Sequence, residues 1–255
     1  MLAMVLALAM VQGPATPTAP LRYRIEARTA SEQDLTSVGK GKLSGGLTST
    51  AIVSVTLTDS AEGQIVRVTV DSMKLEPTGA MTQSLPLSAA GAVGDSTRGA
   101  FVRAYAVRGV VRGAPQASSP SPALAPIIQA MNVLFPGLRS NFKVGDSWTD
   151  TSIVNNDVAN GHQSGRILAT WKVTGMENGG FVLDGTAATT MTTTAQNGQT
   201  LRVNGRSQEH LVMAGRGPAR SASIESANDV VMTSPRNATP IPAKSVGSLR
   251  LTPLP

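Results

Sequence analysis

Two serines of this chain stand in a context typical of one class of esterase. Gly94-Asp95-Ser96 and Gly145-Asp146-Ser147 both reproduce the Gly-Asp-Ser opening in which the serine is the nucleophile. That chemistry needs a histidine base, which such enzymes present three residues after an aspartate. His162 and His210 are the two histidines of the chain, and neither follows an aspartate at that distance. We therefore assign no catalytic residues and expect a protein that is not an enzyme; a hydrolase with a site assembled from distant loops is the alternative.

Metal and cofactor chemistry finds equally little support. Glu209 and His210 are consecutive, so on a strand they point to opposite faces and do not converge on one ion. Asp146, Asp150 and Asp157 are too dispersed for a calcium loop. The chain has no cysteine, which excludes disulfides, thiolate ligands and a lipid-modified N-terminal cysteine. We expect no cofactor and no metal.

Four arginines form the densest run of positive charge. Arg98, Arg108 and Arg112 share one face of a continuous extended strand, and Arg103 lies on the other. The net charge of +6 is spread evenly, because residues 1–120 and 121–255 each hold 11 basic and 8 acidic residues. A nucleic-acid-binding arm would concentrate that excess, so we expect no nucleic acid partner. A solvated strand face is the main interpretation, and a surface for acidic envelope polymers is the alternative.

One segment carries a helical pattern. Its apolar residues recur at i, i+3, i+4, i+7 and i+10, which is one stripe of an α-helix. Ser121 and Pro122 are typical of an N-cap and a first helical position, and Pro136-Gly137 ends the pattern. The sequence therefore predicts one helix over residues 121–135. If this helix encloses a cavity against the sheet, the cavity is lined by Leu124, Ile127, Ile128, Met131, Leu134, Phe135 and Trp148.

The remainder of the chain is typical of antiparallel strands. Apolar and polar residues alternate with period two over 50–58 and 66–71, on both sides of a turn that contains Gly63. Asn-Gly at 178–179 and at 197–198 marks hairpin turns, and at 197–198 we expect the type I′ geometry that needs φ > 0 at both residues. Further strands are expected over 21–28, 99–112, 167–174, 199–214 and 219–233.

The last predicted strand, residues 243–252, follows three prolines, Pro235, Pro240 and Pro242. Because proline cannot donate a ladder hydrogen bond, these residues predict an edge position. So many antiparallel strands must curl, close or split. We expect a mainly β fold, a large curled antiparallel sheet that is either a partly open barrel or two packed sheets, with the one central helix packed on its concave face.

The N-terminus has the pattern of an export signal. Residues 1–11 are an uninterrupted apolar run, too short to span a membrane but suited to a signal-peptide core. Gly13 and Ala15 supply small residues for a cut after Ala15, and residues 16–20 form a flexible mature N-terminus. A single β-rich domain is then expected over 21–255, with a strand group at 21–113, the helix, and a strand group at 147–252. No other stretch approaches spanning length, so we expect an exported protein of the periplasm, the cell envelope or the medium.

A short phrase carries a family resemblance. Phe135-Pro136-Gly137-Leu138 followed by Lys143-Val144-Gly145-Asp146-Ser147-Trp148 resembles the "P-x-L … V-x-V-G-D-S-W" phrase of uncharacterised families of exported bacterial β-rich proteins. The resemblance implies a compartment and a fold class, but no activity. By analogy with periplasmic lipoprotein carriers, whose open barrel is capped by helices, the leading hypothesis is a non-enzymatic envelope protein. Two interpretations of the helix stay open: it fills the core, which is the favoured one, or it encloses a cavity for an apolar or amphiphilic ligand between sheet and helix.

Overall fold

The computed structural model describes most of the chain from residue 20 to its end. The described residues are 20–60, 63–80, 101–107, 110–113, 130, 133–134, 142–158, 161–213, 218–235 and 237–255. The fold and the site below concern these residues. Residues 1–15, the expected export signal, lie outside them.

Eleven strands and one short 3-10 helix, η1 (Thr36–Val38), make up the described fold. The strands are β1 (Leu21–Asp34), β2 (Lys42–Ser60), β3 (Gly63–Gly79), β4 (Phe101–Val107), β5 (Val110–Gly113), β6 (Ser147–Val158), β7 (Gly161–Glu177), β8 (Gly180–Ala195), β9 (Thr200–Met213), β10 (Ala219–Ser234) and β11 (Asn237–Leu254). All of them pair antiparallel, in the order β5-β4-β3-β2-β1-β11-β10-β9-β8-β7-β6.

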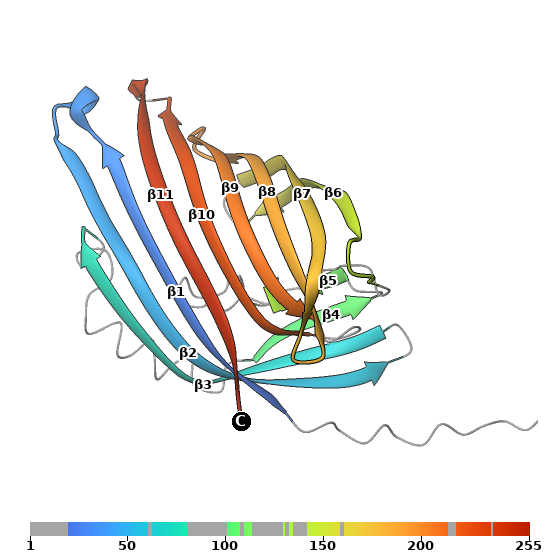
Figure 1. The fold of residues 1–255 in the computed structure, drawn as a ribbon. Coiled ribbons are helices and arrows are strands. Elements are labelled where there is room, and N and C mark those ends of the chain that lie inside the picture. The colour runs from blue at the N-terminus through green and yellow to red at the C-terminus, as the bar shows by residue number, and fades with distance from the viewer. Residues whose placement is uncertain are drawn as a thin grey trace, which may run out of the picture.

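The strands form one curled sheet that is not closed. In Figure 1 the two edge strands, β5 and β6, both lie towards the right of the view, while the long strands β1, β2, β10 and β11 form its left part. The prediction of a mainly β, antiparallel fold is confirmed. Of the two arrangements that the sequence left open, two packed sheets are not what the described strands form, since all eleven belong to one sheet.

The first and last described strands along the chain, β1 and β11, are neighbours at the centre of the sheet. Twelve residue pairs join them, from Arg22 opposite Leu254 to Gln33 opposite Ala243. The prediction that the final strand lies at an edge is therefore wrong. Pro242 lies beyond the last pair with β1, and Pro253 lies beyond the last pair with β10. At each of these prolines β11 extends past the end of its pairing with one neighbour, so the missing N–H breaks no ladder on that side. The prolines therefore do not exclude an interior strand.

Two Asn-Gly pairs turn the chain in different ways. Between β7 and β8, Asn178 and Gly179 both have positive φ, 48° and 72°, as a type I′ turn requires. Between β8 and β9 only Gly198 has positive φ, and its N–H donates to the Ala195 carbonyl at 2.9 Å. The hairpin predicted at 197–198 is confirmed, but the type I′ geometry expected there is wrong, because the loop is longer and places only the glycine in the left-handed region.

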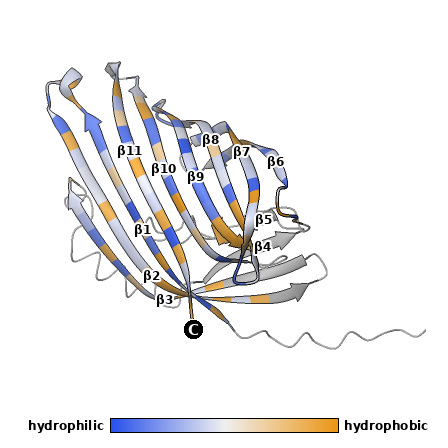
Figure 2. Cartoon of the chain, in the orientation of Figure 1, coloured by the Kyte–Doolittle hydropathy of each residue, from blue (hydrophilic) through white to orange (hydrophobic). Residues whose placement is uncertain are grey.

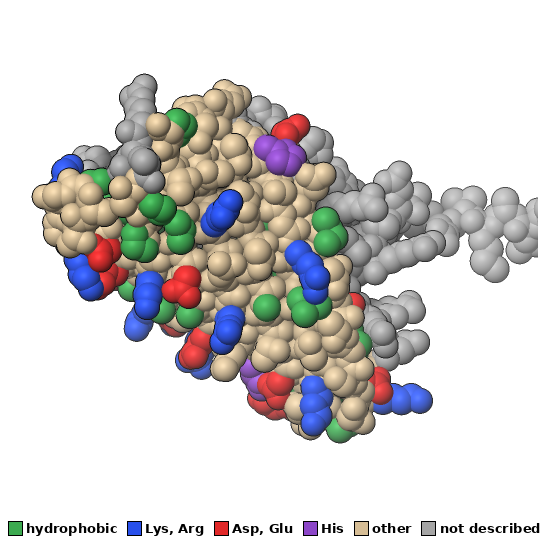
Figure 3. Space-filling model, turned by 90° about the horizontal axis from the view of Figure 1, so that it is seen from above, with side chains coloured by type: hydrophobic (Ala, Val, Ile, Leu, Met, Phe, Trp, Pro, Cys, Tyr) green, Lys and Arg blue, Asp and Glu red, His purple; other side chains and the backbone are tan. Residues whose placement is uncertain are grey.

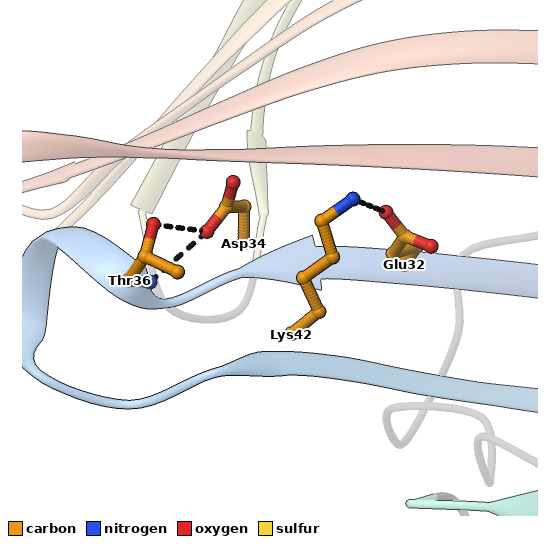
Figure 4. A network of polar contacts seen from close by, with 4 residues as sticks. All are labelled: Glu32, Asp34, Thr36 and Lys42. Carbon is orange, nitrogen blue, oxygen red and sulfur yellow. Dashed lines mark hydrogen bonds and ion pairs between the residues drawn. The ribbon is translucent and has the colours of Figure 1, made fainter.

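The hairpin between β1 and β2 is closed by side chains. Asp34 Oδ1 accepts hydrogen bonds from the Thr36 N–H at 3.0 Å and the Thr36 hydroxyl at 2.6 Å, and these bonds lower the pKa of the Asp34 carboxyl (Figure 4). Lys42 Nζ lies 2.9 Å from Glu32 Oε1 across the two strands. These contacts fix the register of the central hairpin at its exposed tip.

The predicted helix over 121–135 lies mostly outside the described residues. Within that segment the structure describes Ala130, Val133 and Leu134, which are helical in conformation and buried. All three belong to the hydrophobic core, in which Phe142 and residues of the sheet also take part. In the part of the chain that the structure describes, no helix is long and apolar enough to cross a membrane.

Candidate ligand-binding face

The two faces of the sheet differ sharply in chemistry. Residues directly opposite in an antiparallel pair share a face, so the register divides the strand residues into two sets. We call the face that carries Ile25 and Leu211 the inner face, and the other the outer face. Figure 2 shows the resulting alternation of hydrophobic and hydrophilic bands along the long strands. The described lysine and arginine side chains at outer positions are Arg22, Arg24, Arg28, Lys42, Lys74, Arg166, Lys172, Arg202, Arg206, Lys244 and Arg250.

One end of the inner face is a packed core. A row of directly opposed residues, which we call the core row, crosses eight strands from β7 to β3 and is apolar throughout. Its members are Val173, Leu183, Leu211, Ala222, Leu251, Ile25, Ala51 and Met73. Most of these side chains are fully buried in one contiguous cluster. Tyr23 joins this end, and its hydroxyl donates to the Ala219 carbonyl at 3.2 Å.

Two rows beyond the core row, the inner face changes to small and polar residues. We call this region the belt; it consists of Thr29, Ser31, Gly205, Ser207, Ser226, Asn228, Ser245 and Gly247. A hollow of about 210 Å³ lies here, lined by belt residues and by Ala27, Ile224 and Leu249. It is also bordered by Arg28, Val246 and Ser248, which occupy outer positions of β1 and β11. One water needs roughly 10–15 Å³, so the hollow can take a small polar group.

The next row returns to apolar side chains. Met191, Val203, Val230 and Ala243 are directly opposed across β8 to β11, and we call these four residues the apolar rim. Unlike the core row, each of them is only partly buried. Met191 lies over the backbone of Gly165 on β7, where an added Cβ would meet its sulfur at 2.7 Å. The inner face therefore presents accessible apolar surface above a polar belt.

A single carboxylate lies between the core and the belt. Glu209 sits at an inner position of β9, opposite Ile224 on β10 and Gly185 on β8. Ser207 Oγ donates a hydrogen bond to its Oε1 at 3.0 Å, and burial raises the pKa of the Glu209 carboxyl. No described cation lies within ion-pair distance of it. Apart from Glu209, the described inner side chains of β6 to β11 include one other charged group, the exposed Asp150 on edge strand β6.

Of the predicted cavity-lining residues, the structure describes two. Leu134 is 1% exposed and Trp148 is 7% exposed, and both belong to the hydrophobic core. The Trp148 ring stacks on Phe142 with centroids 5.8 Å apart, and its indole N–H donates to Asp150 Oδ2 at 2.8 Å. The other predicted residues, Leu124, Ile127, Ile128, Met131 and Phe135, lie outside the described residues.

The phrase that includes Trp148 begins with a tight turn. Gly145 has a φ of 97°, and the carboxylate of Asp146 accepts a hydrogen bond from the Lys143 N–H at 2.9 Å. The Gly145 N–H donates to the Val173 carbonyl at 2.8 Å, which ties this turn to β7. β6 begins directly after this turn, and its second residue, Trp148, is directly opposite Trp171 on β7.

The four predicted arginines are only partly described. Arg98 and Arg108 lie outside the described residues, whereas Arg103 is in β4 and Arg112 is in β5. Because the chain reverses between these strands, Tyr105 is opposite Arg112, and Arg103 and Arg112 occupy positions of the same face. The prediction that Arg103 and Arg112 lie on opposite faces is therefore wrong: it assumed one continuous strand where the chain forms a hairpin.

Each histidine meets a carboxylate on the outer face. His210 Nδ1 lies 2.7 Å from Asp184 Oδ1, and the Thr174 hydroxyl donates to Asp184 Oδ2 at 2.9 Å. These bonds, led by that of His210, lower the pKa of the Asp184 carboxyl. Ser223 is directly opposite His210 on β10, so an Asp-His-Ser series crosses three strands.

The second histidine lies near the hairpin between β6 and β7. His162 bonds Asp157 through Nδ1 and Asn155 through Nε2, each at 2.9 Å, so both ring nitrogens are engaged. Both imidazoles are about half exposed, with side-chain exposures of 49%. In the described part of the chain, no group of three His, Asp or Glu side chains could hold a metal ion.

A larger hollow of about 1170 Å³ lies mainly over the outer face. Its floor is a row of small or short side chains on four adjacent strands, Gly46, Ala30, Val246 and Ala227. Its borders carry charges of both signs, among them Arg28, Glu32, Arg206, Glu225 and Lys244. Figure 3 shows Lys and Arg interspersed with Asp and Glu over a surface that is mostly neither charged nor hydrophobic. Mixed charges around a shallow floor do not favour an apolar ligand.

Comparison with known proteins identifies a fold but no family. No family model matches the chain, and no curated protein matches its sequence. Among solved structures, the chain is similar to one that concerns lipid–protein interactions in lipovitellin, with a TM-score of 0.51 and 13% sequence identity. The similarity covers 94% of this chain and 25% of that lipovitellin chain, so the protein spans about a quarter of the length of its structural neighbour.

Proposed function

We propose that this protein is an exported carrier that binds an apolar or amphiphilic molecule, such as a lipid, on the inner face of its sheet. The observation that carries the proposal is the apolar rim of Met191, Val203, Val230 and Ala243. These side chains are accessible on a face where no described lysine or arginine of β6 to β11 has a paired position; Arg220, in the bulge of β10, donates to the Asn178 carbonyl. Accessible apolar surface beside a polar hollow is typical of a site for an amphiphile.

The energetics favour this ligand class. Removing a methylene from water contributes about 0.8 kcal/mol, so an acyl chain laid along the rim would gain several kcal/mol before the cost of association. All of the core-row side chains except Met73 are already buried, so the core row offers little such surface. The rim, by contrast, gains burial only when something covers it.

The proposal includes the segment 121–135 as the cover of the core end of the inner face. Burial of Ala130, Val133 and Leu134 against residues of the sheet supports this placement. The fold shared with lipovitellin, whose solved structure concerns lipid–protein interactions, also supports a lipid as the ligand class. At 13% identity that similarity concerns the fold, and the ligand rests on the chemistry of the inner face.

A pair of variants on neighbouring residues tests the site. Val203 and Asn204 are consecutive on β9, the first on the inner face and the second at an exposed outer position. Val203→Asp should abolish displacement of a neutral fluorescent dye by monoolein from the delipidated protein, because it places a charge in the rim. Asn204→Asp adds the same charge on the other face and should leave displacement unchanged. Equal behaviour of the two variants, both folded by circular dichroism, would overturn the proposal.

The hydrolase alternative makes a different demand. Asp184, His210 and Ser223 are adjacent, but β10, which carries Ser223, is paired on both sides, by β9 and β11, so its backbone N–H groups are engaged in the ladder. An oxyanion needs free donors beside the nucleophile. A fluorophosphonate probe should therefore leave the protein unlabelled; covalent labelling of Ser223, mapped by mass spectrometry, would favour the hydrolase.

Export is the remaining part of the proposal, and it rests on the apolar run at residues 1–11 and the small residues Gly13 and Ala15. Expression of the full chain in a bacterial host should yield an envelope or secreted form that begins at Thr16. Intact-mass measurement of the fractionated protein would detect this cleavage. Recovery of the uncut chain from the cytosol would contradict it.

A further inference from the structure

The belt on the inner face is rich in hydrogen-bonding groups that are only weakly engaged with one another. Asn228 Nδ2 donates to Ser245 Oγ at 3.2 Å, and Ser226 Oγ donates to the Gly247 carbonyl at 3.4 Å. The hydroxyls of Thr29 and Ser31 reach backbone carbonyls of β2 at 3.5 Å. Hydroxyl hydrogen bonds are usually about 2.5–3.0 Å long, so these groups can exchange their present partners for a ligand at little cost.

The belt also has room for such a ligand. The hollow of about 210 Å³ is lined by Thr29, Ser226, Asn228, Ser245 and Gly247, among others. A Cβ added at Gly247 would fall 3.0 Å from Ser226 Oγ, so the glycine keeps the hollow open. Hydroxyls and an amide offer both donors and acceptors, which matches a headgroup that itself carries hydroxyls.

The charges around the hollow disfavour an anion. Glu209 lies beside the hollow. On β9, Glu209 is directly opposite Ile224 of β10, and Ile224 lines the hollow. The next inner residue of β9, Ser207, is likewise opposite a lining residue, Ser226. The described lysines and arginines of β9, β11 and β1 occupy outer positions, and one of them, Arg28, also borders the hollow. An anionic headgroup in the belt would therefore approach a partly buried carboxylate, while the one described cation that borders the hollow, Arg28, occupies an outer position of β1.

From these observations we propose that the inner face selects uncharged, hydroxyl-bearing amphiphiles, with the headgroup in the belt, the acyl chain along the apolar rim, and Glu209 as the group that discriminates against anions. A monoacylglycerol is the simplest member of this class. The inference rests on the proposed function, since it names the headgroup chemistry of the same site. In this arrangement the Glu209 carboxylate accepts a hydrogen bond from a ligand hydroxyl and repels a ligand carboxylate.

Three probes that share a chain length but differ in headgroup charge test this inference: monoolein, oleate and oleylamine. Each is used to displace a neutral fluorescent dye from the delipidated protein at pH 8, below its critical aggregation concentration. Monoolein should displace the dye at a concentration at least about tenfold lower than oleate, which corresponds to a discrimination of about 1.4 kcal/mol. Glu209→Gln should strengthen oleate binding, so that the displacing concentrations of oleate and monoolein come within about threefold of each other. Glu225→Gln, an equivalent change at an exposed outer position of β10, should leave the ratio unaltered.

The outcomes separate the two proposals. Displacement by oleate as strong as that by monoolein would overturn the headgroup selectivity and leave the carrier function standing. Stronger displacement by oleylamine than by monoolein would also overturn it, because Glu209 would then act as a counter-ion for a cation. If none of the three probes displaces the dye, the carrier function itself fails. If the Glu209→Gln variant still binds oleate at least about tenfold more weakly than monoolein, Glu209 is not the group that discriminates against anions.

Discussion

The indole of Trp171 on β7 covers the backbone of Gly185 on β8, directly across the strand pair. A Cβ added at Gly185 would overlap the Cζ3 and Cε3 atoms of that ring. Trp171 is 5% exposed and faces Trp148 on its other side, so the ring has no free space into which to move. The glycine is therefore what allows the tryptophan to lie flat at the border between the core row and the belt.

Gly185→Ala should destabilise the protein by about 1–3 kcal/mol, the usual cost of overpacking a filled core. The matched control is Gly175→Ala on β7, where an added Cβ meets nothing within 4 Å and should cost little. Urea unfolding followed by tryptophan fluorescence measures both. Equal midpoints for the two variants would show that the ring yields to the methyl group.

Glu209→Gln should raise the free energy of unfolding at neutral pH. Burial raises the pKa of the Glu209 carboxyl in the folded state, so the folded protein holds this proton more tightly than the unfolded chain. The stability linked to that proton is complete below the ordinary pKa of a glutamate and is lost as the pH rises through the raised pKa. The variant should thus unfold at higher urea than the wild type at pH 7, and the difference should disappear towards pH 4. A constant difference across this range would mean that the effect is not one of charge.

Asn178→Ala should cost about 1 kcal/mol, because a non-glycine residue pays that amount to hold a left-handed conformation unless its side chain favours it. Asn178 has a φ of 48° in the turn between β7 and β8. Asn178→Gly should restore or exceed the wild-type stability, since glycine adopts positive φ without strain. Thermal unfolding of the two variants tests this, and a loss of the same size in both would point to the side chain instead of the backbone.

The strands and hairpins could be predicted from the sequence because their signals are local. Period-two alternation over 50–58 and Asn-Gly at 178–179 each specify a neighbour within a few residues. The pairing of β1 with β11 has no local signal, since it joins residues more than 200 positions apart. Proline is excluded only from positions where a strand is hydrogen-bonded on both sides. The prediction for β11 failed because Pro242 and Pro253 each have a paired neighbour on one side only, which depends on the lengths of β1 and β10 and cannot be read from the sequence.

The candidate site could have been predicted in part. Leu201, Val203, Gly205, Ser207, Glu209 and Leu211 occupy alternate positions of β9, so parity alone places Glu209 on the apolar face. Glu209 and His210 alone show only that the two side chains point to opposite faces. The longer series of β9 decides which one points inward, because Leu201, Val203 and Leu211 share the parity of Glu209. The belt could not be predicted, because it forms only when small and polar residues from four strands, β1, β9, β10 and β11, come into register.

The hydroxyl of Tyr23 links two strands that are not hydrogen-bond neighbours, β1 and β10, and it should make stability depend on alkaline pH. Burial raises the pKa of Tyr23 from its ordinary value of 10.0 to about 12, so the folded protein keeps the phenol protonated where the unfolded chain ionises. The contribution of the protonated Tyr23 phenol to the free energy of unfolding is complete below pH 10 and is lost as the pH rises through about 12. Tyr23→Phe should cost about 1 kcal/mol at pH 8, the net contribution of a buried hydrogen bond.

The difference between wild type and Tyr23→Phe isolates this group from the lysines that titrate in the same range. It should be constant from pH 7 to 9 and shrink from pH 10 upward, because the variant has no phenol to ionise at position 23. Urea midpoints at matched ionic strength give the measurement. A difference that grew above pH 10 would mean that the folded state tolerates the phenolate, and that the Ala219 carbonyl is not what holds the proton in place.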